Sequence, residues 1–149
     1  MSEVTTGVQI VLAQHCNGNE IPRLFGGQLM AWIDVIGAVA ARRYSGRPVT
    51  TACIDNLSFL KPAYLNDIVS QEARVTWTGR TSMEVRVDTF VEHDDKRDLC
   101  NRAYLVFVAL DENERPAPVK EFIPQTEEEE AEYAAAVERK IARMAAGSE

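Results

Sequence analysis

The hydrophobic and polar positions of this chain change their period several times, and each change indicates a different element. Residues 8–14 are short, apolar and partly β-branched, a pattern that predicts a first strand. Asparagine, glycine and proline then mark residues 15–25 as a loop. From residue 26 to residue 44 the chain is apolar almost all round, and Ser45-Gly46 follows as a stop signal. This stretch predicts a long helix that is buried on most sides.

The middle of the chain alternates between apolar and polar side chains, as antiparallel strands do. Residues 69–78 and 83–91 carry this alternation clearly and predict a hairpin, with a bulge at residues 90–91 where the phase breaks. Residues 103–110 are continuously apolar and predict a strand in the centre of the sheet. A further strand is expected over residues 49–59. One face of that strand would carry Val49, Thr51, Cys53, Leu57 and Phe59.

The end of the chain has the signals of an additional helix. Thr126 is followed three residues later by Glu129, which is the form of a capping box. The apolar seam of this helix would consist of Ala134, Val137, Ile141 and Met144. The order of elements predicts an α+β fold, with an antiparallel sheet around one long helix over residues 1–125 and an added helix over residues 126–149.

Composition and charge narrow the function classes. Hydrophobic residues make up 46% of the chain and charged residues 26%, which is typical of a soluble globular domain. The net charge of −7 disfavours nonspecific nucleic-acid binding, because such binding needs a basic surface. No uncharged stretch is long enough to cross a membrane, and no secretory signal is visible. We therefore expect a cytoplasmic protein with neither nucleic-acid nor membrane partners.

Cysteine and histidine are too sparse for a metal site. Cys16, Cys53 and Cys100 are an odd number of cysteines without the CxxC spacing of zinc ligands. His15 stands beside Cys16, but His93 lies far away in a charged stretch. We expect the cysteines to be reduced and structural, and we expect no metal.

The best functional clue is Asp34, the only charged residue between residues 26 and 41. A helical aspartate normally finds a cation three or four positions away. Asp34 instead has the uncharged neighbours Met30, Ala31, Gly37 and Ala38 at those positions. The carboxylate therefore has three possible environments: a distant partner such as an arginine across the core, a wet cleft where it can do chemistry, or burial with a shifted pKa.

Eight motifs occur in an order and with spacings that resemble one known family. They are Asn19, Phe25-Gly26-Gly27, Trp32-Ile33-Asp34, Thr51-Ala52, Asp55, Phe59-x-Lys61-Pro62, Gly79-Arg80-Thr81-Ser82-Met83 and Val108-Ala109-Leu110-Asp111. Over residues 7–119 the chain is similar to the acyl-coenzyme A thioesterases of the hot-dog fold, in particular the YciA-type and brain-type acyl-CoA hydrolase group. The resemblance implies a sheet wrapped around the central helix, a homodimer with active sites at its interface, and assembly into hexamers as trimers of dimers.

The same resemblance implies hydrolysis of acyl-CoA to a free carboxylic acid and coenzyme A, without a metal or redox cofactor. Asp34 would attack the thioester carbonyl as a nucleophile or act as a general base toward water, and both routes stay open. Asn19 would orient the water or the carboxylate. The backbone amides of Gly26 and Gly27, at the positive end of the helix, would polarise the carbonyl. Close packing of helix on sheet is the alternative role of these glycines.

A short turn resembles the family's coenzyme A contact region. In this turn Arg80 would meet a phosphate group, because guanidinium groups pair with phosphate oxygens. Gly79, Thr81 and Ser82 would hold pantetheine or phosphate oxygens through backbone and hydroxyl donors. An ordinary hairpin turn is the alternative interpretation.

Two features modify the expected site. Family members usually have glycine three residues before Phe25, where this chain has Pro22; the loop is therefore restricted, and Asn17 competes with Asn19 for the same role. In addition, eight helical residues separate Gly26 from Asp34, which is about 12 Å of rise. This distance is too long for one thioester carbonyl. We expect the glycine amides and Asp34 of one site to come from different protomers.

Two other functions remain as alternatives. A noncatalytic acyl-CoA sensor would retain the binding pocket without turnover. A dehydratase or hydratase acting on acyl thioesters would need a histidine paired with a carboxylate. We expect neither His15 nor His93 to stand beside the central helix in such an arrangement.

Overall fold

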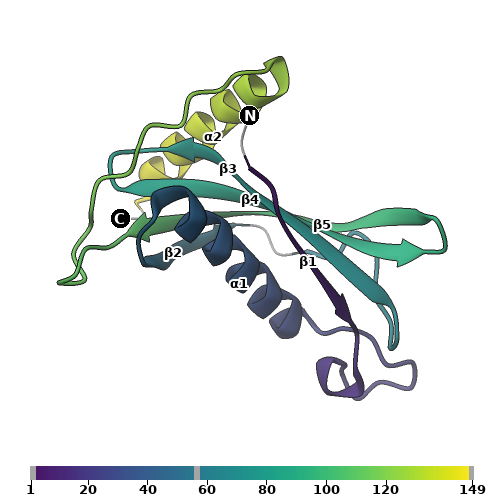
Figure 1. Cartoon of the computed structure of the whole chain (residues 1–149). Coiled ribbons are helices and arrows are strands. Elements are labelled where there is room, and N and C mark those ends of the chain that lie inside the picture. The colour runs from purple at the N-terminus through teal and green to yellow at the C-terminus, as the bar shows by residue number, and fades with distance from the viewer. Residues whose placement is uncertain (1–2, 56–57, 148–149) are drawn as a thin grey trace.

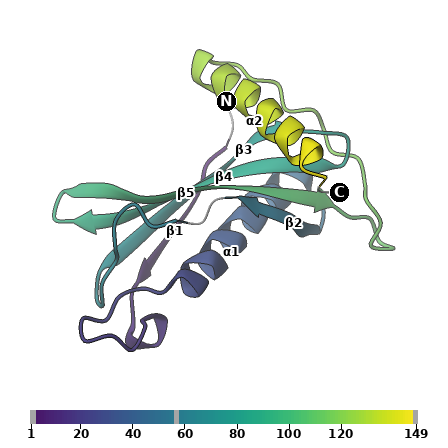
Figure 2. The same ribbon diagram turned by 180° about the vertical axis from the view of Figure 1, so that it is seen from behind.

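The computed structural model describes residues 3–55 and 58–147 as one antiparallel sheet with a long helix on each face (Figures 1 and 2). The strand order in the five-stranded sheet is β1-β3-β4-β5-β2, so β1 and β2 are the edge strands. The elements are β1 Thr5–Ile10, a 3₁₀ turn Ala13–His15, α1 Gly26–Ser45, β2 Val49–Asp55, β3 Ile68–Thr78, β4 Ser82–His93, β5 Lys96–Ala109 and α2 Glu127–Ala145. No described helix has the length and apolar character needed to span a membrane.

Helix α1 matches the predicted long helix and packs against the inner face of the sheet. Its end is set by Gly46, which has φ +69° and whose N–H bonds to the Arg42 carbonyl. The α1 residues Leu29 and Ile33 are fully buried. At Gly37 an added Cβ would lie 3.1 Å from the Phe107 ring, so glycine allows the helix and the sheet to approach closely here.

The side of α1 that faces away from the sheet is open in this chain. Val35 is 65% exposed and Met30 is 42% exposed. The expectation that the helix is buried on most sides is therefore wrong for a single chain, because one sheet covers only one side of a helix. The apolar outer side remains available for contact with another molecule.

The first strand lies earlier in the chain than its apolar pattern predicted. It covers Thr5–Ile10, and the predicted residues beyond it form a 3₁₀ turn instead. The Leu12 N–H donates to Nδ1 of His15 at 3.0 Å, and this local bond replaces strand pairing. Val11 pairs with the backbone of Asn66 and Asp67 in a loop. The bounds of this strand follow from its pairing with β3 and not from its apolar residues.

The central hairpins agree with their predicted alternation. The predicted bulge at residues 90–91 is confirmed within one residue, since the register between β4 and β5 shifts between Thr89 and Phe90. Strand β5 is interior as predicted, but it begins at Lys96. The turn between β4 and β5 consists of Asp94 and Asp95, because the hairpin stays paired up to His93 and Lys96.

Strand β2 differs from its prediction in two ways. It ends at Asp55; residues 58–59 are not strand, and Leu57 lies outside the described residues. In addition, Cys53 does not share a face with Thr51, because the register against β5 shifts between these two residues. A bulge of this kind inserts one residue and turns the following side chains to the opposite face.

Helix α2 covers part of the outer face of the sheet and uses a different side than predicted (Figures 1 and 2). Its start is as expected, since Oγ1 of Thr126 accepts the Glu129 N–H at 3.0 Å. The predicted seam is wrong, because Ile141 and Met144 are 54% and 65% exposed while Ala136 is buried. The helix is oriented by charges: ion pairs join its Glu132, Arg139 and Arg143 to Arg86, Glu84 and Asp55 of the sheet.

Candidate functional site

The carboxylate of Asp34 accepts a hydrogen bond from a strand residue on the neighbouring edge of the sheet. Oγ1 of Thr51 donates to Oδ1 of Asp34 at 2.6 Å. Asp34 itself is half-buried, and Thr51 is exposed. Within the described residues, no cation lies within 4.0 Å of Asp34. The alternative in which Asp34 pairs with a distant arginine is therefore wrong for this chain.

The register of β2 explains why Thr51 meets the helix. Thr51 stands opposite Phe107 of β5, and the Phe107 ring packs against Gly37 of α1. Residues directly opposite in an antiparallel pair share a face, so the Thr51 hydroxyl points to the side where α1 lies. The sequence placed Thr51 in a motif without a role. The signal for this role is that the Thr51 hydroxyl faces α1 and its Asp34 carboxylate. This orientation follows only from the register of β2 against β5, which the sequence pattern does not give.

The glycines stand at the beginning of α1, as predicted. The carbonyl of Phe25 accepts the N–H groups of Gln28 and Leu29, and the Phe25 N–H in turn donates to the His15 carbonyl at 3.2 Å. The N–H groups of Gly26 and Gly27 precede the first intrahelical bonds, and no backbone carbonyl among residues 3–55 and 58–147 accepts them.

Close packing of helix on sheet does not explain these two glycines within one chain. A Cβ at Gly26 would meet nothing within 4 Å. A Cβ at Gly27 would meet only the ring of the preceding Phe25, at 3.0 Å. Contacts with the sheet therefore do not account for glycine at these two positions.

The loop before α1 uses one of its two candidate asparagines internally. Oδ1 of Asn17 accepts the backbone N–H groups of Asn19 and Arg23, each at 3.4 Å. The Asn19 side chain is exposed. Asn17 thus organises the loop, as an Asx turn does. The same loop borders a cavity of about 390 Å³ at the start of the helix, lined by Asn17, Arg23, Leu24, Phe25, Gly26, Phe59, Leu60, Lys61 and Pro62.

The turn between β3 and β4 is held tightly by its backbone. The Gly79 N–H donates to the Ser82 carbonyl at 2.9 Å, and a Cβ at Gly79 would lie 2.9 Å from both Ser82 Oγ and the Trp77 ring. The carbonyls of Arg80 and Thr81 accept N–H groups from Val119 and Ala109. The exposed Arg80 side chain is left on the surface of a fixed turn.

This turn lies beside the last residues of α1, far from the glycines. The Tyr44 hydroxyl donates to the Lys120 carbonyl at 2.9 Å, and the adjacent Val119 N–H bonds to Arg80. A helix of twenty residues is about 30 Å long. The predicted site residues therefore form three groups along α1: the glycines and loop at its start, Asp34 with Thr51 near its middle, and residues 79–82 at its end.

Within the described residues, neither histidine is paired with a carboxylate beside α1, as a dehydratase would need. His15 lies beside α1, with its ring 4.9 Å from the Trp32 ring. Its Nδ1, however, accepts the Leu12 N–H, and no salt bridge within the described residues joins His15 to a carboxylate. His93 is exposed at the far end of β4, where Nε2 lies 3.8 Å from Asp98. In the same described ranges, no three His, Cys, Asp or Glu side chains are grouped as metal ligands.

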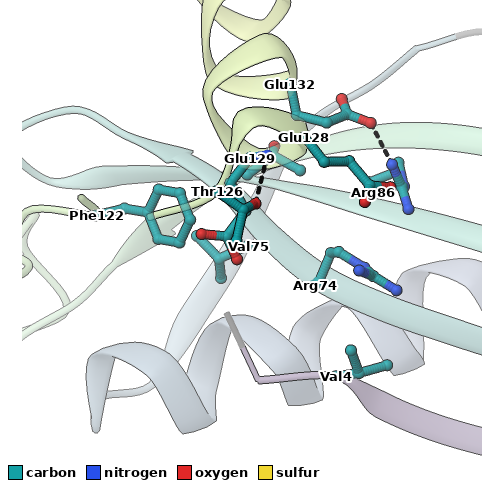
Figure 3. A pocket seen from close by; sticks show the side chains of 10 residues that line it. Val4, Arg74, Val75, Arg86, Phe122, Thr126, Glu128, Glu129 and Glu132 are labelled. Atoms are coloured by element: carbon teal, nitrogen blue, oxygen red, sulfur yellow. Dashed lines mark hydrogen bonds and ion pairs between the residues drawn. The ribbon is translucent and has the colours of Figure 1, made fainter. Parts of the chain in front are cut away.

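A second cavity, of about 220 Å³, lies on the outer face beneath the start of α2 (Figure 3). Arg86 pairs there with Glu132 and, at 3.3 Å, with Asp88. The remaining lining is mixed, and none of the predicted site residues takes part: Val4, Arg74, Val75, Thr76, Phe122, Thr126, Glu128 and Glu129. This hollow separates a helix from a sheet and is distant from the Asp34 side of the molecule.

Comparisons with known proteins agree with this arrangement. Residues 22–97 match the family model of the thioesterase superfamily. The uncharacterized acyl-CoA thioester hydrolase YkhA of Bacillus subtilis is 45% identical over 118 residues, which are 78% of this chain and 69% of that protein. A solved hexameric acyl-CoA thioesterase has a TM-score of 0.89 and 37% identity, over 97% of this chain and 93% of the other.

An acyl-CoA hydrolase from Staphylococcus aureus, solved with butyryl coenzyme A, coenzyme A and coenzyme A disulfide, has a TM-score of 0.86 at 36% identity, over 97% of this chain and 90% of that one. Variants of that enzyme with alanine in place of an asparagine, an aspartate or a threonine have also been solved. These likenesses confirm the predicted hot-dog fold. Because the family model matches residues 22–97, which are just over half of the chain, and a solved thioesterase shares its fold, the chain belongs to the thioesterase superfamily.

Proposed function

We propose that this protein is an acyl-CoA thioesterase that hydrolyses acyl-CoA to a free carboxylic acid and coenzyme A. The observation that carries the proposal is the Asp34 carboxylate, which accepts a hydrogen bond from the Thr51 hydroxyl at 2.6 Å and has no ion pair with any cation in residues 3–55 and 58–147. The names of its relatives support the substrate class, since they are acyl-CoA thioester hydrolases. The proposed reaction requires no metal or redox cofactor.

The hydrogen bond from Thr51 gives the two carboxylate oxygens of Asp34 different roles. Oδ1 of Asp34 accepts the hydrogen bond from the Thr51 hydroxyl, so Oδ2 remains available to react with water or with the substrate. In the general-base route Oδ2 takes a proton from water, the hydroxide adds to the thioester carbon, and the C–S bond breaks. In the nucleophilic route Oδ2 itself adds to that carbon, and water hydrolyses the resulting anhydride. In both routes coenzyme A leaves as a thiolate that then takes up a proton.

The site is proposed to be shared between two chains. One chain keeps the Gly26 amides and Asp34 about 12 Å apart along the helix axis, which is too far for one carbonyl. The edge strand β2 and the exposed apolar residues Met30 and Val35 of α1 offer a surface for a second copy. We propose a homodimer as the smallest active unit and a trimer of dimers as the full assembly, in line with the hexameric neighbour.

Residue spacing supports Asn19, Asp34 and Thr51 as one functional set. The asparagine, aspartate and threonine replaced in the S. aureus variants are spaced along that chain as these three are in this one. Because Asn17 already uses its side-chain oxygen in the loop, we assign to Asn19 the role of orienting water or the carboxylate. Gly26 and Gly27 would polarise the carbonyl.

Coenzyme A is proposed to contact the turn of residues 79–82. The exposed Arg80 guanidinium supplies a cation for a phosphate, and the fixed backbone of the turn presents Thr81 and Ser82 beside it. Because this turn lies at the opposite end of α1 from the glycines, a shared site also explains how one substrate reaches both groups.

We also propose that the protein works in the cytoplasm. Its cysteines are unpaired, with Cys100 buried and Cys16 and Cys53 half-buried. Burial raises the pKa of the Cys100 thiol to about 11, so this thiol is protonated and inert at neutral pH. Reduced structural cysteines suit a reducing compartment.

The decisive experiment is thiol release from a panel of short, medium and long acyl-CoAs by the purified full chain. Hydrolysis of at least one member is expected. Binding of acyl-CoA without release of thiol would instead favour the noncatalytic sensor. Single-turnover hydrolysis in ¹⁸O water then separates the two routes, because only the anhydride route leaves label on Asp34.

A further inference from the structure

The cavity of about 390 Å³ at the start of α1 has apolar walls from two segments of the chain. Leu24 and Phe25 come from the loop before the helix, and Phe59, Leu60 and Pro62 come from the segment after β2. Small-molecule sites in proteins have volumes of about 300 to 1,000 Å³ and are lined mostly by apolar side chains. The cavity therefore has the size and the walls of a site for an apolar group.

Backbone hydrogen bonds hold both walls in place within one chain. The Leu24 N–H donates to the Ala63 carbonyl at 2.8 Å, and the Leu24 side chain is only 2% exposed. The Leu60 N–H donates to the Cys100 carbonyl of β5 at 2.7 Å. A pocket that exists before its ligand arrives binds that ligand without the cost of ordering a loop.

Two cations also line the cavity, and both make contacts of their own. The Cζ of Arg23 lies 5.5 Å from the centroid of the Tyr64 ring, and Nζ of Lys61 lies 3.6 Å from Asp98. Both cationic side chains are exposed. Long cationic side chains can keep their charge in water while their stems cover apolar surface. An uncharged chain can therefore fill the cavity without burying either charge.

Gly26 connects this cavity to the proposed reaction centre. It belongs to the lining, and its N–H is one of the two amides proposed to polarise the thioester carbonyl. A carbonyl bound to this amide lies beside the cavity. Two groups are attached to the carbonyl carbon, the acyl chain and the sulfur of coenzyme A, and either of them could extend into the cavity.

The position of coenzyme A decides between these two groups. Coenzyme A is proposed to contact residues 79–82, which lie at the other end of α1, about 30 Å from the glycines of the same chain. The second copy would supply Asp34 to this carbonyl, and its own turn is closer, since the eleven positions from Asp34 to Ser45 are about 17 Å of rise. Coenzyme A therefore extends toward the second copy, and the acyl chain lies on the side of the cavity.

We infer that this cavity is the acyl-chain site, and that Phe59 and Leu60 make the protein favour aliphatic acyl groups of several carbons over an acetyl group. The inference rests on the proposed function, because it locates one end of the substrate proposed above. Apolar contact with the walls grows with each buried methylene group, so the benefit of the cavity increases with the length of the acyl chain.

The first test uses Phe59→Gln, which replaces part of an apolar wall by a polar amide. It lowers kcat/KM for octanoyl-CoA about tenfold, because apolar contact with the acyl chain is lost, and leaves kcat/KM for acetyl-CoA within about twofold of wild type. Leu60→Gln, at a 64% exposed position of the same wall, shifts the ratio of the two substrates in the same direction. A ratio that is unchanged in both variants overturns the inference.

The matched control is Ile68→Gln. Ile68 is 40% exposed and Phe59 is 37% exposed, so the two changes replace apolar side chains of similar exposure. Ile68 begins β3 and is not part of the cavity lining. The ratio of octanoyl-CoA to acetyl-CoA hydrolysis therefore stays at the wild-type value in this variant. A shift as large as that of Phe59→Gln overturns the assignment of the cavity.

The second test needs no turnover. The affinities of coenzyme A and of S-octyl-coenzyme A, a thioether that cannot be hydrolysed as a thioester, are measured by calorimetry with the purified full chain. Wild type binds the octyl compound about tenfold tighter or more, and Phe59→Gln removes most of this difference while its affinity for coenzyme A is unchanged. Equal affinities in wild type overturn the inference. An equal loss for both ligands in Phe59→Gln also overturns it, because coenzyme A itself would then occupy the cavity.

The two tests separate this inference from the proposed function. A wild-type protein that prefers the octyl compound through Phe59 but hydrolyses no acyl-CoA keeps the acyl-chain site and rejects only the proposed function. A wild-type protein that hydrolyses acyl-CoA, with a chain-length preference that Phe59→Gln and Leu60→Gln leave unchanged, keeps the proposed function and rejects only the acyl-chain site.

Discussion

The two faces of the sheet bind their helices through different interactions, apolar packing for α1 and ion pairs for α2. On the inner face, α1 packs through uncharged side chains such as Leu29, Ile33 and Gly37 against Phe107. On the outer face, α2 is held by three pairs of opposite charges that reach from the helix to β4 and β2. In apolar packing an unpaired charge is costly unless it keeps contact with water or a hydrogen-bond donor, whereas in a buried ion pair the loss of one partner leaves the other charge uncompensated.

This difference separates the two roles of charge in the molecule. The inner layer holds one charged side chain on α1 between residues 26 and 41, and it has no cation partner within the described ranges. The outer layer balances its charges against one another, and hydrogen bonds to Glu84 raise the pKa of the Arg139 guanidinium. The lone charge is available for chemistry, and the paired charges stabilise the fold.

The largest effect is expected from Asp34→Ala, which removes the one charged side chain of α1 between residues 26 and 41. The variant is expected to lose turnover about a thousandfold, because a nucleophile or general base is removed. Its thermal unfolding should stay close to wild type, since the half-buried carboxylate satisfies only the Thr51 hydroxyl. Thiol release and coenzyme A binding are measured together. Full activity, or loss of coenzyme A binding, would contradict the proposed role.

Arg139→Ala tests the opposite claim on the outer face. It leaves the fully buried Glu84 carboxylate without its bidentate partner and also removes the guanidinium that lies 3.6 Å from the Tyr104 ring. Breaking a buried pair from one side costs about 3 kcal/mol of unfolding free energy. Urea unfolding measures this loss.

The control for Arg139→Ala is the double variant Glu84→Gln with Arg139→Gln. A neutral amide at position 84 keeps a hydrogen bond with Thr76, which donates to Glu84 at 2.6 Å in the wild type. Because no buried charge is left unpaired, at least half of the lost stability should return. A double variant as unstable as the single one would show that the guanidinium stabilises α2 by packing and not by charge.

Gly37→Ala probes the tolerance of the inner face. Alanine favours a helix interior over glycine by about 1 kcal/mol, but the new Cβ would lie 3.1 Å from the Phe107 ring, which is fully buried. We expect overpacking to exceed the helical gain and to destabilise the protein by about 1 kcal/mol. The companion variant Gly26→Ala, whose Cβ meets nothing within 4 Å, lacks this clash. Stabilisation by Gly37→Ala would show that the helix can move away from the sheet.

The same contrast explains what could be predicted from the sequence. Hydrophobic period revealed α1 and the hairpins, and the missing local cations singled out Asp34. The partner of Asp34 was not predictable, because Thr51 faces α1 only through the register of β2 against β5. The bulge at Ala52, which separates Thr51 from Cys53, has no signature in the alternation of side chains.

The helix α2 was placed correctly along the chain but rotated wrongly about its axis. A search for an apolar seam selects Ile141 and Met144, whereas the sheet beneath the helix presents charged groups and therefore selects Arg139 and Arg143. The candidate site was incomplete for another reason. Its three groups are distributed along α1, and the site shared between two chains that we propose would need a second copy, which the sequence of one chain does not position.

The smallest effect is expected from Ile141→Gln, which replaces an exposed apolar side chain of α2 by a polar one. Ile141 is 54% exposed, so a single chain loses little burial and unfolding should change by less than about 0.5 kcal/mol. The contrasting variant is Ala136→Gln, which forces a larger polar side chain into the buried side of the same helix and costs about 1–3 kcal/mol. Chemical unfolding at two protein concentrations measures both. If Ile141→Gln is the more costly change and its cost depends on concentration, the apolar side of α2 is a contact between copies of the chain, and charge alone does not explain the orientation of the helix.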